Sequence, residues 1–376
     1  MRVACVQSFP IDYCIDFVNA IAPTHDVTFL AADRHVKGLE TFVDPRAELV
    51  SLSWPRHRSL ANINLLRRMS QIVRSRDIDV VHFLGDDVSW LNFLPFMIGR
   101  RPIVITIHDA TTHPGDHESL VLPRFAVEQF YQRGTRLIVH GESIRTALAK
   151  RSGRSPDVID IVPHVAMHRY QEVAKRRGLE ATPDQGVRRL LFFGRVMAYK
   201  GLPDLLAAAR LTKQRTAPSL KLVVAGRGPA LDDVRPELGA DHVQLFDQFV
   251  PDELVAQLFL DTDLVVLPYL EASQSGILAI AAAFGKPVLV TDVGELGEIV
   301  RATGMGLVAP PSDPEALSAA ISRFLTDPAF ASELAEASRR AGSGDGLLSR
   351  RHVATRAEAS YQKAIEAKAL PTRRAG

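Results

Sequence analysis

The segment LLFFGRVMAYKG, residues 190–201, is the most informative stretch of this 376-residue chain. Its first four residues are apolar, which is typical of a short buried strand, and Gly194 ends the run. Arg195 and Lys200 follow five residues apart, and Gly201 opens a segment with a helical pattern. A strand, a turn with two cations and a helix N-terminus predict an anion site, and two cations suit a diphosphate better than a single carboxylate. Solvated loop charges are the alternative interpretation.

Length and composition exclude several classes of protein. The chain is too long for one ordinary core and suits two domains of about 150–190 residues each. Apolar residues make up 46% and the net charge is +2, which is typical of a globular protein and gives no reason to expect nucleic acid. No apolar run reaches the roughly 20 residues of a membrane span, and the N-terminus does not resemble a secretory signal. Two cysteines, Cys5 and Cys14, predict neither disulfides nor a zinc cluster, so we expect a cytoplasmic protein.

Short apolar runs alternate with helical patterns along the whole chain. Strands are predicted at residues 2–7, 27–30, 79–83, 102–107, 136–139, 158–162, 190–193, 220–225, 243–246, 264–267 and 287–291. Helices are predicted at residues 60–76, 202–211, 252–260, 277–284, 316–325 and 350–369. This alternation predicts an α/β fold of two Rossmann-like domains, each a parallel sheet with helices on both faces. The charged segment 171–189 reads as an exposed connection between them.

In parallel sheets of this kind, ligands bind beyond the carboxyl ends of the strands. His108 directly follows a predicted strand of the first half, with Asp109 beside it, so its side chain is a candidate to meet a ligand. A structural role or a helix cap is the alternative. His113 and His117 are four apart but flank a Pro-Gly pair rather than sharing a helix face, so we reject a metal site.

Other polar groups of the first half allow two interpretations. Asp86 and Asp87 follow a predicted strand and either face a substrate or are solvated, while Ser143 is predicted to cap a helix. The first strand-to-helix loop, residues 7–14, contains no glycine, which argues against a dinucleotide-binding fingerprint.

An aromatic residue stands beside a basic cluster in the first half. Trp54 precedes Arg56-His57-Arg58, and Arg67-Arg68 follow on the next predicted helix. This combination is a candidate for contact with an anionic membrane surface, and a solvated charged loop is the alternative.

Glycines also mark the loop after the second strand of the second half. Gly226 and Gly228 flank Arg227 there, and glycines let the backbone come close to a ligand. A tight turn uses the same residues.

The second informative segment is PYLEASQSGIL, residues 268–278. It follows a predicted strand and leads into a helix, whose first N–H groups and positive dipole end can receive a phosphate. Glu271 lies where a carboxylate can accept hydrogen bonds from sugar hydroxyls, or it is an exposed turn acid. The residues predicted to bind this phosphate-bearing ligand are Gln274, Ser275, Gly276, Ile277 and Leu278.

Two helices of the second half carry clear local signals. Asp313-Pro314-Glu315 predicts a capped helix start. In the C-terminal helix, Val353, Ala357 and Tyr361 recur every four residues, so this stripe should pack against the rest of the chain.

Taken together, these segments resemble glycosyltransferase family 4, whose members are retaining enzymes of the GT-B fold. The resemblance rests on five stretches in the same order: GR…KG at 194–201, VVAGRGP at 223–229, DLVVLP at 263–268, GKPV at 285–288, and DVG…E at 292–298. It covers residues 190–328, and the first half only through Thr106-Ile107-His108-Asp109.

The resemblance implies roles for individual residues. Arg195 and Lys200 would bind the donor diphosphate and offset the charge on the leaving group, and Gly194 would adjoin it. His108 matches the histidine that approaches the donor sugar and the acceptor. The sequence also departs from the family pattern of two glutamates eight residues apart: Glu271 is one residue early for the first, Ile280 stands at the second, and Glu298 is another acidic candidate for the donor.

The resemblance implies two facing domains: residues 1–170 for the acceptor and 190–349 for the donor, joined by the linker 171–189. The helix at 350–376 would cross back to the first domain. The implied enzyme is a hexosyltransferase that moves a sugar with retention to an acceptor hydroxyl of a carbohydrate, lipid-linked or small-molecule acceptor. Polysaccharide, glycolipid or natural-product synthesis would fit. We expect no cofactor and no metal, because two cations already neutralise the diphosphate, and at most weak peripheral membrane contact through the first domain.

Two other functions fit the same pattern. A sugar-nucleotide epimerase or hydrolase would turn over a donor without an acceptor. A non-catalytic nucleotide-sugar-binding subunit would bind a donor without turnover, and the missing glutamate at Ile280 favours it.

Overall fold

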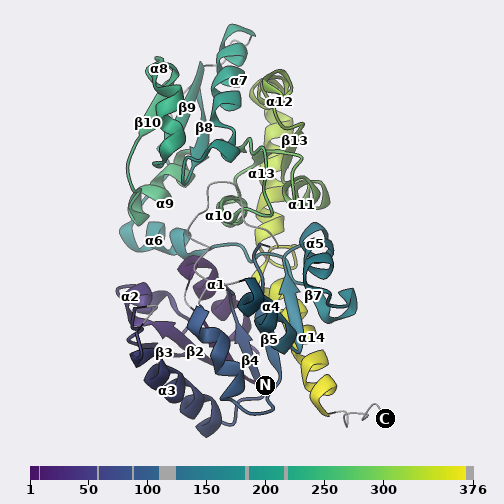
Figure 1. Ribbon diagram of the computed structural model, residues 1–376. Helices are drawn as coiled ribbons and strands as arrows, with labels where there is room; N and C mark the ends of the chain where they lie inside the picture. The colour runs from purple at the N-terminus through teal and green to yellow at the C-terminus, as the bar shows by residue number, and fades with distance from the viewer. Residues whose placement is uncertain are drawn as a thin grey trace. The chain divides into compact units, whose positions relative to one another are not determined.

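A computed structural model of the chain describes residues 1–7, 9–56, 59–86, 89–109, 124–182, 186–215 and 219–369. These residues form two compact units, each with its own parallel sheet (Figure 1). The first unit contains the chain up to Val165 and the C-terminal helix, and the second runs from Ala166 to Ser349. The passage between them therefore lies before residue 170. The expected linker 171–189 contains most of helix α6 (Arg169–Arg177), which belongs to the second unit and pairs Arg169 with Asp252.

The sheet of the first unit has seven parallel strands in the order β3-β2-β1-β4-β5-β6-β7. The strands are β1 (Arg2–Val6), β2 (Asp26–Ala32), β3 (Glu48–Leu52), β4 (Val80–Phe83), β5 (Ile103–Thr106), β6 (Arg136–Val139) and β7 (Ile159–Ile161). β5 and β6 are neighbours in register, with Thr106 opposite Ile138, so the residues that follow these two strands leave the sheet side by side.

Helices cover both faces of this sheet. They are α1 (Ile11–Ile21), α2 (Asp33–Val36), α3 (Ala61–Ser75), α4 (Arg124–Arg133), α5 (Glu142–Ser152) and α14 (Arg350–Ala369), with short 3-10 turns η1 (Glu40–Phe42), η2 (Ser89–Phe96) and η4 (Pro156–Val158). α1 and α14 pack together on one face, where Figure 1 shows α14 in yellow. The predicted stripe is confirmed, because Val353, Ala357 and Tyr361 are fully buried. Tyr361 also hydrogen-bonds His82 of β4, 2.8 Å from its Nδ1.

A buried ion pair ties α14 to the edge of the same sheet. Arg136 on β6 donates two hydrogen bonds to Asp160 on β7, at 2.8 and 2.7 Å. Ser360 and Lys363 of α14 donate to the same carboxylate at 2.8 and 2.9 Å. Helix α14 is thereby held to the sheet of the first unit.

The sheet of the second unit has six parallel strands in the order β10-β9-β8-β11-β12-β13. They are β8 (Val187–Phe193), β9 (Ser219–Ala225), β10 (Val243–Phe246), β11 (Leu264–Leu267), β12 (Val288–Thr291) and β13 (Gly306–Ala309). Central strands such as β11 are buried on both faces, as expected when helices lie on each side of a parallel sheet.

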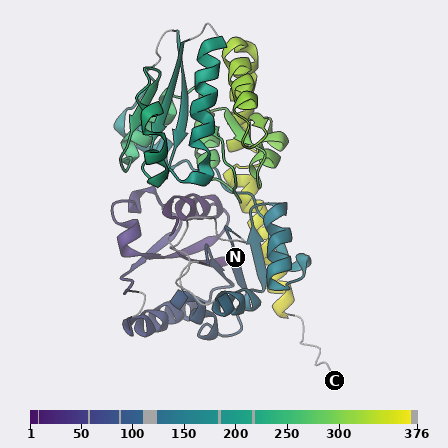
Figure 2. The same ribbon diagram turned by 45° about the horizontal axis from the view of Figure 1, so that its top comes forward.

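The helices of the second unit, besides α6, are α7 (Leu202–Arg215), α8 (Arg235–Leu238), α9 (Asp252–Asp261), α10 (Gly276–Phe284), α11 (Leu296–Thr303), α12 (Pro314–Thr326) and α13 (Pro328–Gly342). Two 3-10 turns, η5 (Ala198–Lys200) and η6 (Pro229–Val234), follow β8 and β9. α7 packs beside α12, as Figure 2 shows within this unit. A core of buried aliphatic residues from β8, β9, α7 and α12 fills the space between sheet and helices.

Several local predictions differ from the structure. β3, β13 and α13 were not predicted, and the helix after β6 is capped by Gly141 and begins at Glu142, so the prediction that Ser143 caps it is wrong. Asp313 does cap α12, since its side chain accepts a hydrogen bond from the Ala316 N–H at 2.9 Å.

Candidate anion site in the second unit

The strand order of the second sheet reverses between β8 and β11. β8 lies between β9 and β11, so the chain leaves β8 and β11 toward opposite sides of the sheet. Ligands of doubly wound folds bind at this point, beyond the carboxyl ends of the two strands. The segments that begin here are residues 194–200 after β8 and 268–275 after β11, which are the two segments that the sequence singles out.

The loop after β8 is joined to the loop after β9 by backbone hydrogen bonds. Gly194 N donates to Ala225 O at 2.9 Å, and Val196 N donates to Arg227 O at 3.0 Å. A Cβ on Gly226, whose φ is +141°, would lie 1.9 Å from Gly194 O, so only glycine allows this contact. Gly226 and Gly228 therefore bring the backbone close to the neighbouring loop, and their contact with a ligand stays a prediction.

The loops after β8 and β11 are also joined. Leu270 N donates to Tyr199 O at 2.7 Å. Gly201 has a φ of +66°, and a Cβ there would lie 1.9 Å from the carbonyl oxygen of Pro268. Gly201 thus ends η5 and lets the turn that carries Lys200 lie against the segment after β11.

Lys200 points into this junction. The residue is only 9% exposed, and its ammonium donates a hydrogen bond to the Tyr269 hydroxyl at 3.2 Å. The Tyr269 hydroxyl lies 3.3 Å from Ser275 Oγ, which caps helix α10. A Cβ added to Gly194 would lie 3.5 Å from Lys200 Nζ and 3.6 Å from Ile277 Cδ1. The ammonium, Gly194 and the first turn of α10 therefore surround one small region.

The first turn of α10 partly satisfies its own N–H groups. Ser275 Oγ accepts from Ile277 N at 3.3 Å, and Leu278 N donates to Ser275 O at 3.2 Å. The predicted donors at Ile277 and Leu278 are therefore already engaged, so an anion would have to share or replace these bonds. The positive end of the helix dipole still faces the region beside Lys200.

The charge on Lys200 has no carboxylate partner among the residues that the structure describes, since no ion pair within 4.0 Å involves its Nζ. Its recorded partners are the hydroxyl and, at 4.9 Å, the ring of Tyr269. A buried cation is costly unless an anion or a set of hydrogen bonds compensates it. A buried ammonium beside a helix N-terminus is thus a site suited to an anionic ligand.

Replacing Gly201 by alanine should separate the effect of backbone conformation from that of contact. An L-residue in the left-handed conformation costs about 1–2 kcal/mol of stability. We expect Gly201→Ala to cost more than this and to lower Tm accordingly, because its Cβ also meets Pro268 O. Gly178→Ala is the control, since its φ of +62° is similar and nothing lies within 4 Å of its added Cβ. Equal Tm losses in the two variants, measured by thermal unfolding, would contradict the contact.

The other predicted donor residues lie at the surface of this unit. Arg195, Glu271 and Glu298 are exposed, while Gln274 is partly buried in the segment before α10. Ile280, which stands where the family has its second glutamate, is 4% exposed inside α10. The exposure of these side chains does not decide whether they contact a donor, so their assigned contacts stay predictions.

Three histidines gather at the carboxyl ends of β5, β6 and β7 in the first unit. His108, His140 and His164 follow these strands, with ring centroids 5.0 Å apart for the first pair and 5.2 Å for the second. The edge of Tyr13 from α1 meets all three rings. Both ring nitrogens of His108 are engaged within the unit, with Leu84 O at 2.9 Å and His140 Nε2 at 3.0 Å.

Asp86 lies beside this cluster at the end of β4. It accepts a hydrogen bond from the Tyr131 hydroxyl of α4. Burial raises the pKa of Asp86, while this hydrogen bond and a positive charge on His108 act in the opposite direction. Its predicted partner Asp87, and His113 and His117 of the rejected metal pair, lie outside the described residues.

Sequence reasoning missed Tyr269, His140 and His164 as site residues. Tyr269 lies two residues after a predicted strand, which was the available signal. The two histidines also follow predicted strands, but their contact with His108 depends on strand order. Gln7 is fully buried at the end of β1 with a φ of +115°, a conformation rare for residues other than glycine. Nothing in its sequence context indicates this.

Of the two interpretations of the segment around Trp54, the one in which this aromatic side chain contacts a membrane surface finds no support. Trp54 is 6% exposed and packs edge-to-face on Trp90, with ring centroids 5.1 Å apart. His57 and Arg58 lie outside the described residues. Other apolar side chains are exposed instead, at Leu60, Ile63, Phe93 and Phe96.

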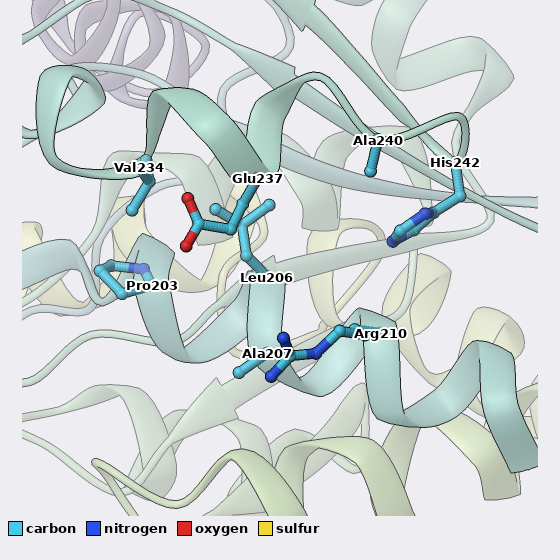
Figure 3. A pocket seen from close by; sticks show the side chains of 8 residues that line it. All are labelled: Pro203, Leu206, Ala207, Arg210, Val234, Glu237, Ala240 and His242. Atoms are coloured by element: carbon cyan, nitrogen blue, oxygen red, sulfur yellow. The ribbon is translucent and has the colours of Figure 1, made fainter.

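A separate hollow of about 140 Å³ lies in the second unit between α7 and the segment around α8 (Figure 3). Arg210, Glu237 and His242 supply its polar side chains, and none of the predicted site residues lines it. Within the described part of the chain, no cluster of histidine, cysteine or acidic side chains is arranged to hold a metal ion. None of the described helices is long and apolar enough to cross a bilayer.

Comparisons with known proteins agree with this architecture. Residues 13–165 match the sequence family described as Glycosyltransferase Family 4, and residues 187–327 match that described as Glycosyl transferases group 1. Anabaena Alr3699/HepE, solved in complex with UDP, superposes with a TM-score of 0.68 over 96% of this chain and 100% of that chain, at 15% identity. The fold of the two units is thus that of the GT-B glycosyltransferases.

Curated relatives match over part of their length. A D-inositol 3-phosphate glycosyltransferase of Rhodococcus opacus is 30% identical over 303 residues, which is 73% of this chain and 66% of that protein. A phosphatidyl-myo-inositol mannosyltransferase of Mycobacterium tuberculosis is 28% identical over 68% of this chain and 65% of that protein. The chain thus spans just under two thirds of each. With a glycosyltransferase family matched in each unit, the chain belongs to the family 4-type glycosyltransferases.

Proposed function

We propose that this protein is a retaining glycosyltransferase that moves a hexose from a nucleoside-diphosphate donor to an acceptor hydroxyl. The observation that carries the proposal is the buried Lys200 ammonium beside the start of α10, with no carboxylate to balance it among the described residues. Family membership and the UDP complex of the Anabaena structure support a nucleotide-sugar as the anion.

The proposed chemistry follows from the direction of charge transfer. As the glycosidic bond breaks, negative charge builds on the oxygen of the departing diphosphate. Lys200 is held in place by Tyr269, so its charge is already oriented before the reaction and requires little reorganisation. Arg195, exposed one residue after Gly194, would supply the second cation, and Glu271 would hold sugar hydroxyls. We expect transfer to continue in the presence of a chelator, since these side chains replace a divalent cation.

A ligand panel tests the proposal. A ligand at 100 times its Kd stabilises a protein by about 2.7 kcal/mol. We therefore expect one of UDP-, GDP-, ADP- or dTDP-sugars to raise Tm by several degrees, at roughly 2–4 °C per kcal/mol for a unit of this size. Stabilisation by no member of the panel would contradict the proposal. The bound donor is then incubated with candidate acceptors, and the anomeric configuration of the product, read by NMR, tests retention.

The same assays separate the two rival functions. An epimerase or hydrolase would consume the donor at full rate without an acceptor. A non-catalytic subunit would be stabilised by the donor but would not consume it with any acceptor.

A surface of the first unit supports the proposal of peripheral attachment to the anionic inner face of the membrane. Phe93 and Phe96 of η2 are 62% and 58% exposed, and Leu60 and Ile63 project from the start of α3. α3 and η2 pack together, as the Ser70 hydroxyl donates to Met97 O at 2.8 Å. Exposed cations accompany the apolar side chains, at Arg67, Arg68, Arg100 and Arg133.

Vesicle binding checks this attachment. Apolar side chains combined with Arg bind anionic interfaces, and losing two phenylalanines should weaken partition by about tenfold or more. We expect co-sedimentation with vesicles containing phosphatidylserine but not with pure phosphatidylcholine, and a loss of it in the double variant Phe93→Ala/Phe96→Ala. Phe249→Ala, which removes a 78% exposed phenylalanine of the second unit, should bind as wild type. Equal binding by all three proteins would contradict the attachment.

A further inference from the structure

Two histidine rings at neighbouring strand ends form a continuous hydrogen-bonded row. His108 Nε2 lies 2.9 Å from Leu84 O, and His108 Nδ1 lies 3.0 Å from His140 Nε2. His140 Nδ1 lies 2.9 Å from Val162 O. The row thus runs from one backbone carbonyl to another through four ring nitrogens.

The number of protons in this row follows from its two ends. A carbonyl oxygen only accepts, so His108 Nε2 and His140 Nδ1 must both carry hydrogen. The central contact between two nitrogens needs a third proton, since two lone pairs at 3.0 Å would repel each other. Two neutral imidazoles carry only two ring N–H protons. A row with all three contacts made therefore holds one proton more than a neutral pair.

The extra charge belongs on His108 rather than on His140. His140 is fully buried, and burial together with a positive charge on His108 holds the pKa of His140 well below its usual range. His140 thus remains neutral, donates through Nδ1 and accepts through Nε2. His108 is only partly buried and lies near Asp86, so it is the better place for an imidazolium.

His82 of the same sheet, in contrast, needs no extra proton. Its two ring nitrogens contact the hydroxyls of Tyr361 and Thr106, each at 2.8 Å. Hydroxyls both donate and accept, so a neutral His82 satisfies both contacts. Burial lowers the pKa of His82 to about 3, in agreement with a neutral ring.

We infer that His108 and His140 share three ring protons, so that His140 is a positioning residue that fixes His108 as an imidazolium at the strand ends of the first unit. The meaning of this charge for the reaction rests on the proposed function. Because both ring nitrogens of His108 are engaged within the first unit, its ring would act on a ligand through its carbon edge and its charge.

Several titratable groups face the pair from the surrounding elements. Tyr13 of α1 touches both rings, and burial raises its pKa, which keeps it neutral. The ring of His164 after β7 lies tilted against that of His140, and burial lowers the pKa of His164 to about 4. The remaining groups are His82 and Asp86 at β4, Asp109 beside His108, and Tyr131 on α4. Asp86 and Asp109 are thus the anionic groups near a charged His108.

Nitrogen NMR of the side chains reads the protonation state directly. The full-length protein is labelled with ¹⁵N, and two-bond nitrogen–proton correlations are recorded at about pH 7, where ordinary histidines are mostly neutral. Ring nitrogens with and without hydrogen resonate in separate ranges. We expect both His108 nitrogens to carry hydrogen, and His140 to carry hydrogen on Nδ1 alone. A wild-type spectrum with one protonated nitrogen on His108 overturns the inference.

Three variants test the role of His140. His140→Phe keeps the ring but removes the acceptor, and His108 should then lose one ring hydrogen. His140→Gln places an amide oxygen close to the former Nε2, so the imidazolium should persist. His164→Phe is the matched control, since the His164 ring contacts the His140 ring while its Nδ1 bonds to Val165 O, and it should leave the His108 signals unchanged. A doubly protonated His108 in folded His140→Phe would overturn the inference.

Turnover provides the second readout. With the donor and acceptor found by the panel, we expect kcat to fall by about tenfold or more in His140→Phe and to recover in His140→Gln. The KM for the donor should stay within about threefold of wild type in both variants. An equal loss in His140→Phe and His140→Gln would contradict the positioning role. If no donor binds, the proposed function fails, but the NMR result still decides whether the pair carries a charge.

Discussion

Replacing Lys200 by methionine should lower the rate of sugar transfer by about 10²- to 10³-fold, the loss typical of removing one preorganised charge-stabilising group. Methionine keeps the length and apolar volume of the stem but cannot offset the charge of a departing diphosphate. The effect should fall on kcat and on donor binding together, because the diphosphate is anionic both before and during bond cleavage. Initial rates with the donor and acceptor found by the panel measure it.

The same substitution should not destabilise the protein. Lys200 is a buried residue, 9% exposed, and its charge has no carboxylate partner in the described part of the chain, so removing the charge relieves a desolvation cost. We expect Lys200→Met to unfold at the same temperature as wild type or above it. Lys213→Met, which removes an exposed lysine of the same unit, is the control and should keep full activity. A rate within about threefold of wild type would remove Lys200 from the proposed role, since a preorganised charge should contribute far more.

The second large effect concerns stability. Asp160→Ala should destabilise the first unit by about 3–5 kcal/mol, because it leaves the buried Arg136 guanidinium without its carboxylate. Both side chains of this pair are 11% exposed, and the same carboxylate holds Ser360 and Lys363 of α14. Denaturant unfolding measures the loss. Glu142→Ala breaks an exposed ion pair of the same unit and should have little effect.

The contribution of Asp160 should also depend on pH in a defined direction. Burial alone would raise its pKa, but hydrogen bonds from Arg136, Lys363 and Ser360 hold the pKa below the usual value. A carboxyl with a lowered folded-state pKa stabilises the fold above its unfolded pKa, about 3.9, and this contribution disappears as the pH falls through the folded pKa. The stability difference between wild type and Asp160→Ala should be constant from neutral pH to about pH 5 and shrink below about pH 4. A difference that grows on acidification would contradict this account.

The sequence predicted the interior strands well, because their signal is local. β6, β10 and β11 were predicted with their bounds. Of these, β11 is an uninterrupted apolar run of four residues, which suits a strand buried on both faces. β3, an edge strand, was missed because it has no such run, as its exposed Glu48 and Ser51 show. The edge strand β13 was missed as well. The N-cap of α5 was misplaced because the residue at this position is Gly141, which has no side chain to signal a cap.

The candidate site divides in the same way. Lys200 and the start of α10 were found because each lies in or just after the loop that follows an apolar strand. The partnership of Lys200 with Tyr269 could not be found, because it depends on β8 and β11 being neighbours, which only the strand order reveals. The row from Leu84 through His108 and His140 to Val162 spans the ends of four strands and has no sequence pattern of its own.

Binding of a nucleoside diphosphate tests the central claim most directly, because it requires neither an acceptor nor turnover. UDP, GDP, ADP and dTDP are titrated calorimetrically into wild type, Lys200→Met and Lys213→Met, each alongside its nucleoside. The account predicts that one diphosphate binds wild type and Lys213→Met alike, that its nucleoside binds much more weakly, and that Lys200→Met loses at least about tenfold in affinity, or about 1.4 kcal/mol. Equal affinity of Lys200→Met and wild type for that diphosphate would contradict the account.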